Sequence, residues 1–416
     1  MFIMVLNFGF KIYLAREFPQ EDLVVYYTIT DVFSVIGRIF VGYKDALTTL
    51  YNQTFHKLKI LRTWSVFFFW VIVLFGLVVI PAVFHLYIVE KVPDIQIDWW
   101  HMTMLFVTMN FVSFYGYLFL VTKHYKLISI NDMLKTVAYI TTVLSLYRVW
   151  GMPADHRTLV DASIVSNLLV LVFLLYKQRK YLPHYHPGRL FGLKFARFGD
   201  DTNRRFVWQT ILASSNYFVY GLLLFAPVYT MLQYASVEKV AEFQVVARSI
   251  YFALVAIFSW PLGRFIFPEF SSLLSQKKFD VLEQYRVKFV RSLVLFGVVA
   301  IGGCWLFSKW IVSLLFPEAY AESYQMLDIM IVALPFVMYQ NISESVIKAA
   351  GYYRELIGIK GLGLLLYIIS YVGLQAVLSS YLASVYAFII GIIGIAVVSL
   401  YYEKSILNVQ SIERNR

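Results

Sequence analysis

Four polar residues recur every seven positions through one apolar stretch, residues 22–52, and they are the first candidates for chemistry. They are Asp31, Arg38, Asp45 and Asn52, with Ser34 between the first two. Seven residues return almost to the same side of an α-helix, with a drift of about 20° per heptad. A charge that faces hydrocarbon costs at least roughly 2.5–3.5 kcal/mol on insertion scales. The polar face of this helix is therefore expected to meet a water-filled cavity or partner helices.

Other ionisable residues inside apolar segments are functional candidates for the same reason. The candidates for lining a substrate cavity are Arg38, Arg248, Asp31, Arg264, Lys44 and Lys11. The candidates for a coupling or structural ion pair are Asp45, Glu344, Lys348 and Asp328. A cavity richer in arginine and lysine than in carboxylates suits an anionic substrate, because arginine stays charged and binds phosphate through two hydrogen bonds.

Structural roles remain open for several of these residues. Asp31 and Arg38 could neutralise each other within a helix bundle, and Lys44 and Asp45 could meet the cytoplasmic interface. The spacing of Glu344 and Lys348, four residues apart, is typical of a helical ion pair and favours a structural role.

Arg248 and Arg264 belong to one apolar segment but do not share a face of an ideal helix. They are 16 residues apart, which corresponds to a rotation of about 160° at 3.6 residues per turn. Both can line one cavity only if Pro261 kinks the helix. Otherwise Arg264 extends to the inner headgroups, which makes Arg248 the stronger candidate.

The composition indicates a helical membrane protein that crosses the bilayer several times. Of the 416 residues, 60% are hydrophobic and 15% are charged, whereas soluble domains have about 45–50% and about 25%. The mean hydropathy is +0.68. The alternating ten-residue segments of a transmembrane β-barrel are not visible. The net charge of +11 could suggest nucleic-acid binding, but the distribution of the charged residues along the chain indicates membrane topology instead.

Sequence signals for enzymatic or metal chemistry are poor, so neither a cofactor nor a metal site is expected. The single cysteine, Cys304, lies in an apolar run and excludes a disulfide framework or a cysteine metal cluster. His184 and His186 have no third ligand nearby and are interpreted as part of a solvated loop. Nucleotide-binding, GxSxG and HExxH motifs do not occur, and the predicted outer loops are too short for a catalytic domain.

Twelve membrane spans are predicted, because a span requires about 20 apolar residues. They lie near 1–16, 22–50, 63–89, 99–122, 129–149, 158–176, 206–234, 243–268, 289–316, 323–349, 356–377 and 381–402. The basic connection 177–205 is the longest one. It divides the chain into two six-helix lobes, 1–176 and 206–402, followed by a tail over 403–416.

The distribution of lysine and arginine between the loops predicts the orientation. The loops on the side of the 177–205 linker hold 23 lysines and arginines, and those on the other side hold 5. Cytoplasmic loops carry such an excess. Both termini and the linker are therefore expected to be cytoplasmic.

Several short segments resemble the multidrug/oligosaccharidyl-lipid/polysaccharide (MOP) exporter superfamily, and within it the Wzx-type flippases of surface polysaccharides. The segments are Val246-Ala247-Arg248-Ser249-Ile250, residues 261–271 (PLGRFIFPEFS), residues 314–320 (LLFPEAY), residues 348–351 (KAAG) and residues 41–47 (VGYKDAL). The pattern in the eighth span is an early arginine, a Pro-Leu-Gly segment and a closing Phe-Pro-x-Phe-Ser.

The resemblance implies two six-helix lobes with pseudo-twofold symmetry that alternate in access to the two sides of the bacterial inner membrane. The implied substrate is an undecaprenyl-pyrophosphate-linked oligosaccharide, moved for O-antigen, capsule or exopolysaccharide synthesis. The implied partners are this lipid-linked substrate, membrane lipids and other polysaccharide-assembly membrane proteins. Arg248 matches the cavity arginine of the related lipid II flippase.

Two other functions remain open. One is a small-molecule or drug antiporter of the same fold, and the other is a membrane enzyme of polysaccharide assembly. Cation-coupled drug exporters of the superfamily use acidic residues in spans one, seven or eight. Here spans one and seven lack a carboxylate and span eight has none before Glu269, a pattern that does not favour drug export or the usual sodium site.

Overall fold

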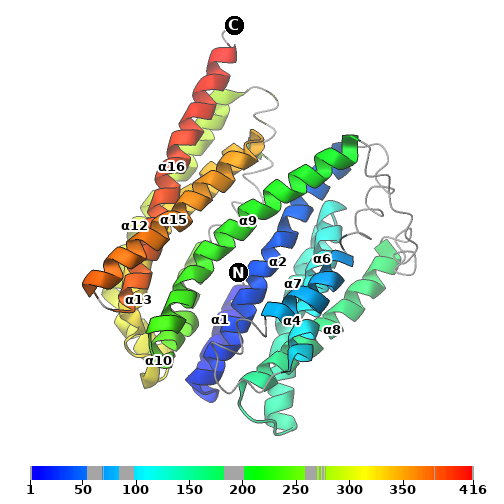
Figure 1. Ribbon diagram of the computed structural model, residues 1–416, viewed down its shortest axis with the longest axis vertical. Coiled ribbons are helices and arrows are strands. Elements are labelled where there is room, and N and C mark those ends of the chain that lie inside the picture. Colours follow the sequence, from blue (N-terminus) through cyan, green and yellow to red (C-terminus); the bar gives the residue numbers. More distant parts are fainter. Residues whose placement is uncertain are drawn as a thin grey trace. The chain divides into compact units, whose positions relative to one another are not determined.

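The apolar segments form long helices in the computed structural model of the protein (Figure 1). The structure describes residues 2–53, 68, 70–83, 98–181, 201–257, 269–270, 273, 276, 278–378 and 380–414. Over these ranges it has no β-strand. The chain divides into two units, which we call the N-terminal unit (Phe2–Ser214) and the C-terminal unit (Ser215–Arg416).

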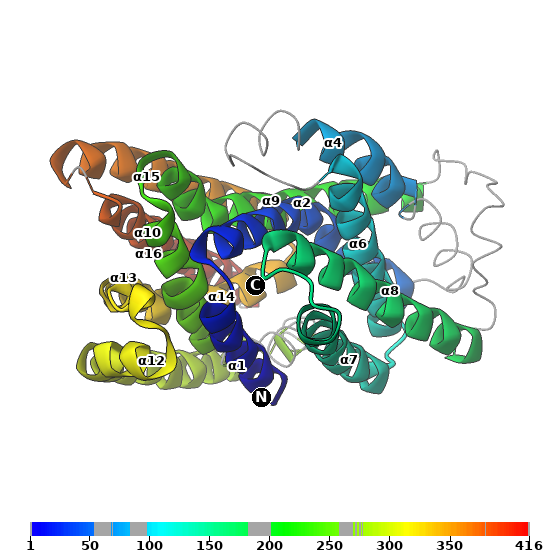
Figure 2. The same cartoon turned by 90° about the horizontal axis from the view of Figure 1, so that it is seen from below.

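The N-terminal unit is a helical bundle. Its elements are α1 (Phe2–Glu17), α2 (Gln20–Gln53), η1 (Phe75–Val79), α4 (Ile80–Val83), α6 (Trp99–Val121), α7 (Tyr125–Leu144), η3 (Ser145–Val149), α8 (His156–Tyr181) and the first part of α9 (Asp201–Tyr234). Within this unit α8 packs against both α6 and α7 (Figure 2).

The C-terminal unit is a second bundle, and α9 enters it from the first. Its further elements are α10 (Val237–Ala241), η5 (Glu242–Ala247), α12 (Phe279–Leu315), η6 (Glu318–Tyr320), α13 (Ser323–Met330), η7 (Ile331–Ala333), α14 (Leu334–Ala349), α15 (Tyr353–Leu378) and α16 (Leu382–Arg414). In this unit α15 and α16 pack side by side (Figure 1).

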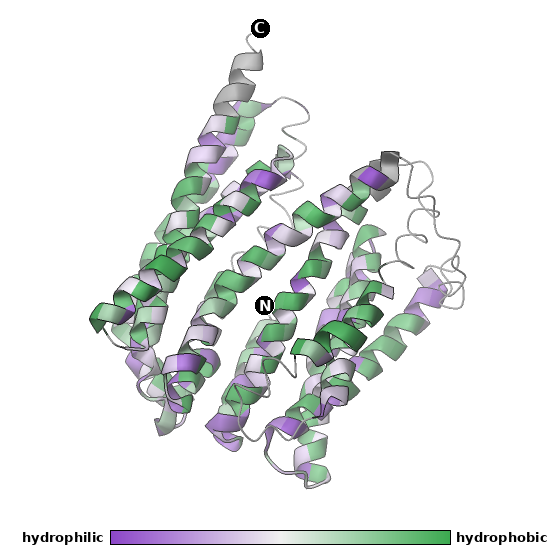
Figure 3. Ribbon diagram, viewed as in Figure 1, coloured by the Kyte–Doolittle hydropathy of each residue, from purple (hydrophilic) through white to green (hydrophobic). Residues whose placement is uncertain are grey.

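The predicted all-α membrane fold is confirmed. In the part of the chain that the structure describes, ten helices are long and apolar enough to cross a membrane. Green, hydrophobic residues dominate helices such as α15 and α16 (Figure 3). Two shorter elements, α1 and Trp70–Val83, fall in the predicted spans 1–16 and 63–89.

The cytoplasmic placement of the termini and the lobe boundaries at 176, 205 and 402 stay predictions. Helix α16 continues past residue 402, so the proposed tail begins inside a helix.

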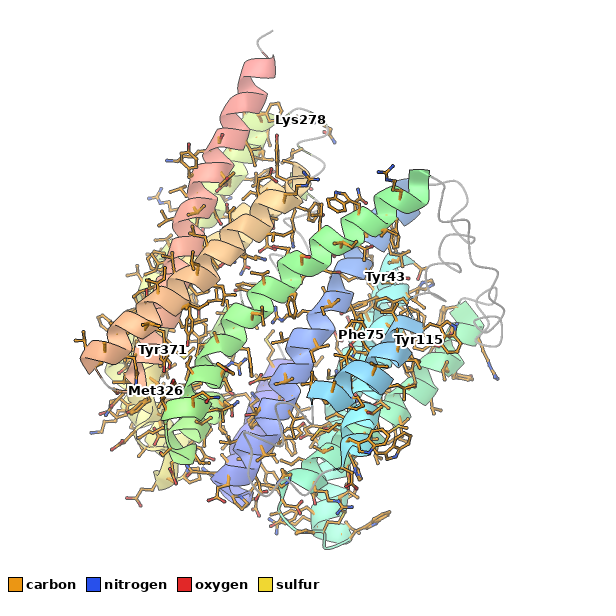
Figure 4. All side chains as sticks on the ribbon, in the orientation of Figure 1. Tyr43, Phe75, Tyr115, Lys278, Met326 and Tyr371 are labelled. Carbon is orange, nitrogen blue, oxygen red and sulfur yellow. The ribbon has the colours of Figure 1, made fainter. Side chains whose placement is uncertain are left out.

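Aromatic side chains fill the core of the N-terminal unit. The Tyr43 ring of α2 stacks on Phe68 with 4.0 Å between centroids, and Phe40 meets Phe68 and Phe75 edge to face. Figure 4 labels Tyr43, Phe75 and Tyr115 in this unit. The face of α2 that carries Tyr43 and Phe40 is therefore anchored, which fixes the orientation of its polar face.

Three described segments are π-helical, which the sequence analysis did not predict. They are η1 in the third span, η3 at the end of the fifth and η5 in the eighth. A π-helical turn inserts an extra residue and rotates the side chains around it, and such turns are frequent at functional sites. Arg248 directly follows η5, so the π-helical turn helps to set the direction of its side chain.

Close approach of α15 and α16 in the C-terminal unit depends on two glycines. A Cβ atom on Gly391 would lie 2.8 Å from the carbonyl oxygen of Gly363, and one on Gly363 would lie 3.0 Å from the carbonyl oxygen of Gly391. Small residues allow membrane helices to approach closely and pack tightly. The two glycines therefore allow the α15–α16 contact.

Replacing Gly391 by alanine is expected to lower the free energy of unfolding by about 1–3 kcal/mol, because the added methyl group meets backbone. Gly361→Ala is the matched control on α15, since nothing lies within 4 Å of its added Cβ. The control is expected to be neutral or stabilising by up to about 1 kcal/mol. Thermal unfolding in detergent micelles measures both. Equal effects of the two substitutions would contradict the close contact.

Candidate functional site

Helix α2 holds its heptad of polar residues at half-buried positions. Asp31, Arg38 and Asp45 are each intermediate in exposure and Ser34 is exposed, whereas Phe33, Phe40 and Tyr43 on other faces are buried. The side chain of Asn52 lies outside the described residues. The amphipathic helix predicted from the sequence is present in the N-terminal unit.

Three of the α2 residues gather around one tyrosine of α6. The Lys44 ammonium lies 3.4 Å from the Asp45 carboxylate and 5.7 Å from the centre of the Tyr117 ring. Asp45 and Arg38 both act electrostatically on the Tyr117 hydroxyl. Two cations and one carboxylate thus share this cluster, which carries a formal charge of +1. We call Arg38, Lys44, Asp45 and Tyr117 the α2 cluster.

Lys11 contributes a further cation to the N-terminal unit. Its ammonium lies 5.1 Å from the centre of the Tyr27 ring, so the charge of α1 faces an aromatic ring of α2. A cation over an aromatic face is stabilised by the ring quadrupole. The contact lets Lys11 keep its charge in a half-buried position.

The C-terminal unit holds a more deeply buried charged cluster. Glu344 of α14 lies 2.7 Å from the Lys348 ammonium and 2.9 Å from the Lys360 ammonium of α15. Lys348 donates a hydrogen bond of 3.1 Å to the hydroxyl of Tyr217 on α9, and the ammonium of Lys360 lies 4.7 Å from the centre of the Tyr220 ring. We call these five residues the Glu344 cluster.

The Glu344 cluster has one more cation than anion in a nearly solvent-free position. Lys360 is only 2% exposed, and the side chains of Glu344 and Lys348 are each 13% exposed. Charges in such surroundings interact more strongly than at a surface. A second anion, such as a phosphate group, would therefore be attracted to the two lysines.

The pairing of Glu344 with Lys348 follows the predicted spacing, but Lys360 and its tyrosines were not anticipated. Lys360 lies inside the predicted span 356–377 but was not among the candidate residues. The structure places it at the start of the third turn of α15. The sequence signal that could have identified Lys360 is the presence of a lysine inside an apolar run.

Arg248 lies in the eighth span, directly after η5, and is half-buried. Its guanidinium carbon is 5.4 Å from the centre of the Phe252 ring, one turn further along the helix. The aromatic face supports the cation. Arg264 and Pro261 lie outside the described residues, so the predicted kink and the position of Arg264 stay predictions.

Asp328 lies in α13 and is not a member of the Glu344 cluster. Its backbone carbonyl accepts a hydrogen bond of 3.0 Å from the indole nitrogen of Trp305. Its carboxylate oxygen Oδ1 is buried with no hydrogen-bond partner among the described residues. The predicted ion pairing of Asp328 is not found in the described part of the chain.

One expectation about the eighth span is wrong. The helix that contains this span begins at Val237 instead of residue 243, so it includes Glu242. The Glu242 side chain is buried and accepts hydrogen bonds from Lys239, at 3.1 Å to each oxygen, and Lys239 also contacts Glu322. Because Glu242 and Glu322 both pair with Lys239, these charged side chains are stabilised by ion pairing. Glu242 and Lys239 can therefore lie in the helix, although the hydropathy pattern placed them outside the predicted span.

A second polar cluster in the C-terminal unit joins three helices and includes Glu403, which the sequence analysis placed in the tail 403–416. Glu403 of α16 is fully buried, lies 3.3 Å from the guanidinium of Arg286 on α12 and accepts a hydrogen bond from the Tyr339 hydroxyl on α14. Arg286 also pairs with Glu283. This cluster links α12, α14 and α16 and has a structural role.

Comparison with solved structures identifies the fold as that of the MATE transporters. An inward-facing multidrug resistance MATE family transporter of the MOP superfamily aligns with a TM-score of 0.80 and 10% identity over 98% of this chain and 95% of the other. An outward-facing one gives 0.70 and 11% over 98% and 92%. A MOP superfamily transporter from Pyrococcus furiosus, described as having a binding pocket of reverse polarity that suggests a different function, gives 0.64 and 10% over 98% and 88%. No protein-family model and no curated protein matches the sequence.

Proposed function

We infer that the protein is a flippase that moves an undecaprenyl-pyrophosphate-linked oligosaccharide across the bacterial inner membrane by alternating access. The proposal is carried by the balance of charge in the polar stripe and cluster of α2, at Lys11 and Arg248, and in the Glu344 cluster. Glu242 and Glu403 are paired with Lys239 and Arg286 and do not enter this balance. The cations are Lys11, Arg38, Lys44, Arg248, Lys348 and Lys360, and the carboxylates of the same clusters and stripe are Asp31, Asp45 and Glu344. Six cations against three carboxylates favour an anionic substrate.

The chemistry of these cations suits a pyrophosphate. Arg38 and Arg248 present planar guanidinium groups that can form paired hydrogen bonds to phosphate oxygens. The lysines of the Glu344 cluster add point charges, which also bind phosphate. In many secondary transporters, rigid-body movement of two helical bundles exposes the binding residues first to one side of the membrane and then to the other. The fold supports this mode, since neighbours are known in inward-facing and outward-facing conformations.

A small-molecule antiporter is the second candidate, and Glu242 is the observation that favours it. A buried carboxylate in the eighth span is the type of group expected in cation-coupled drug export. Its pairing with Lys239 and the presence of Glu322 beside the same lysine give it a structural partner, which favours the flippase. The solved neighbours are transporters, which does not favour a membrane enzyme.

Deletion of the gene separates the two candidates. The flippase is expected to be required for surface glycan, with susceptibility to cationic drugs unchanged, because its cations select an anion. Glycan display is measured by gel staining of surface polysaccharide, and drug susceptibility by growth inhibition in the same strains. Increased drug susceptibility with normal glycan would establish the antiporter and contradict the flippase.

A further inference from the structure

A pocket at one end of the N-terminal unit is not used by the function proposed above. Its volume is about 380 Å³. It lies between the first turns of α6, the η3 turn with the residues after it, and the first turns of α8. Its lining includes Trp100, His101, Trp150 and Asp161. Most of the lining is apolar or aromatic, and Asp161 supplies a carboxylate.

The pocket lies where three membrane helices begin or end. Trp100 is the second residue of α6, Trp150 directly follows η3 and Asp161 is in the second turn of α8. Trp100 is 48% exposed and Trp150 is 76% exposed. Exposed indoles at the ends of membrane helices are typical of the level of the lipid headgroups. The pocket is therefore expected to open toward headgroups.

Two polar side chains in the pocket are close together but do not hydrogen-bond each other. The Nε2 atom of His101 and the Oδ1 atom of Asp161 are 3.7 Å apart, which is too far for a hydrogen bond. The other ring nitrogen of His101, Nδ1, is buried without a hydrogen-bond partner in the described ranges. A donor with several N–H groups, seated beside both residues, can bond to the carboxylate and the imidazole together.

Charges of opposite sign follow each other along α8 beside the pocket. Arg157, which is exposed, precedes Asp161 by one turn and acts on it electrostatically, as do His101 and Asp155. Asp155 accepts a hydrogen bond of 2.8 Å from the backbone nitrogen of Thr158, in the first turn of α8. Asp161 and Arg157 therefore present an anion and a cation about one helical turn apart, which matches the two charges of a zwitterion.

We propose that this pocket binds the headgroup of a phospholipid that carries a primary ammonium group, as phosphatidylethanolamine does. The ammonium donates hydrogen bonds to Asp161 and His101 and lies against Trp100 and Trp150, whose faces attract cations. The lipid phosphate lies toward Arg157, which suits phosphate geometry. A quaternary ammonium has no N–H donor for these two side chains, and the glycerol headgroup of phosphatidylglycerol offers no cation.

Native mass spectrometry of the full-length protein in detergent tests the assignment with three lipids of identical acyl chains. The probes are phosphatidylethanolamine, phosphatidylcholine and phosphatidylglycerol. The wild-type protein is expected to retain phosphatidylethanolamine in preference to the other two. Asp161→Asn is expected to weaken that retention about fivefold to tenfold, because it removes the charge-assisted hydrogen bond. Trp150→Leu is expected to weaken it several-fold through loss of the aromatic face.

Two neighbouring residues outside the pocket provide matched controls. Asp98→Asn removes a carboxylate that is 3.9 Å from the other nitrogen of His101 and 82% exposed, and Trp99→Leu removes an indole that is 44% exposed. Both are expected to leave lipid retention unchanged. Equal retention of the three lipids, retention of phosphatidylcholine as strong as that of phosphatidylethanolamine, or equal losses in the test and control variants would overturn the proposal. Trp150→Leu alters an exposed side chain, so it decides the outcome if Asp161→Asn does not fold.

Discussion

Replacing Glu344 by glutamine is expected to destabilise the protein far more than replacing Lys360 by methionine. Glu344 is the carboxylate that faces both Lys348 and Lys360 in the Glu344 cluster. Its loss leaves two like charges close together in a buried position. Removing one partner of a buried ion pair typically costs about 3–5 kcal/mol, so Glu344→Gln is expected to lower the free energy of unfolding by about that amount.

The lysine substitution gives a different result because it leaves a neutral pair. With methionine at position 360, Glu344 still pairs with Lys348, and the apolar side chain suits a position that is 2% exposed. Its effect is expected to be about 1 kcal/mol or less, since no buried charge is left without a partner of opposite sign. Glu318→Gln, at an exposed carboxylate of the same unit, is the control. Thermal unfolding in micelles measures all three, and equal losses for Glu344→Gln and Lys360→Met would contradict the proposed charge balance.

Arg38→Ala and Arg248→Ala are each expected to reduce glycan translocation by about 30-fold or more. Truncating one partner of a desolvated charge pair costs about 2–5 kcal/mol, and every 1.4 kcal/mol is a factor of about ten. Arg38→Lys retains the charge but not the paired hydrogen bonds, so it is expected to lie between wild type and alanine. The rate of surface glycan export, at equal protein levels in the membrane, is the measurement.

The control for these arginines is Arg179→Ala, at an exposed position near the end of α8. It is expected to export glycan at the wild-type rate, because an exposed arginine at a helix end does not hold the substrate. Full export by both Arg38→Ala and Arg248→Ala would show that the cations of the two units do not bind the substrate, whatever the protein transports.

Hydropathy predicted the spans well because each one is a local property of the sequence. The predicted span 99–122 corresponds to α6, Trp99–Val121, and the span 206–234 ends where α9 ends, at Tyr234. The seven-residue spacing on α2 likewise predicted which residues share a polar face. Both features depend only on residues that are near each other along one helix.

The partners of the charged residues were not predictable in the same way, because they come from other helices. Lys360 lies inside the predicted span 356–377, but its partner Glu344 lies 16 residues earlier on another helix and was paired from the sequence with Lys348 alone. Glu242 was placed just outside the predicted eighth span, 243–268, although Lys239 neutralises it within the helix. Glu403 was placed in a tail, although Arg286 and Tyr339 meet it in the bundle. Ion pairing between helices overrides the local rule that charge marks a loop.

The central claim, that the protein flips a lipid-linked oligosaccharide, is tested most directly by locating that lipid in a strain that lacks the protein. Leaflet-resolved labelling measures how much undecaprenyl-pyrophosphate-linked glycan lies in each leaflet of the cytoplasmic membrane. We expect the glycan to accumulate in the cytoplasmic leaflet and to reach the outer leaflet again when the wild-type gene is restored. Normal transfer of the glycan to the outer leaflet without the protein would contradict the flippase function.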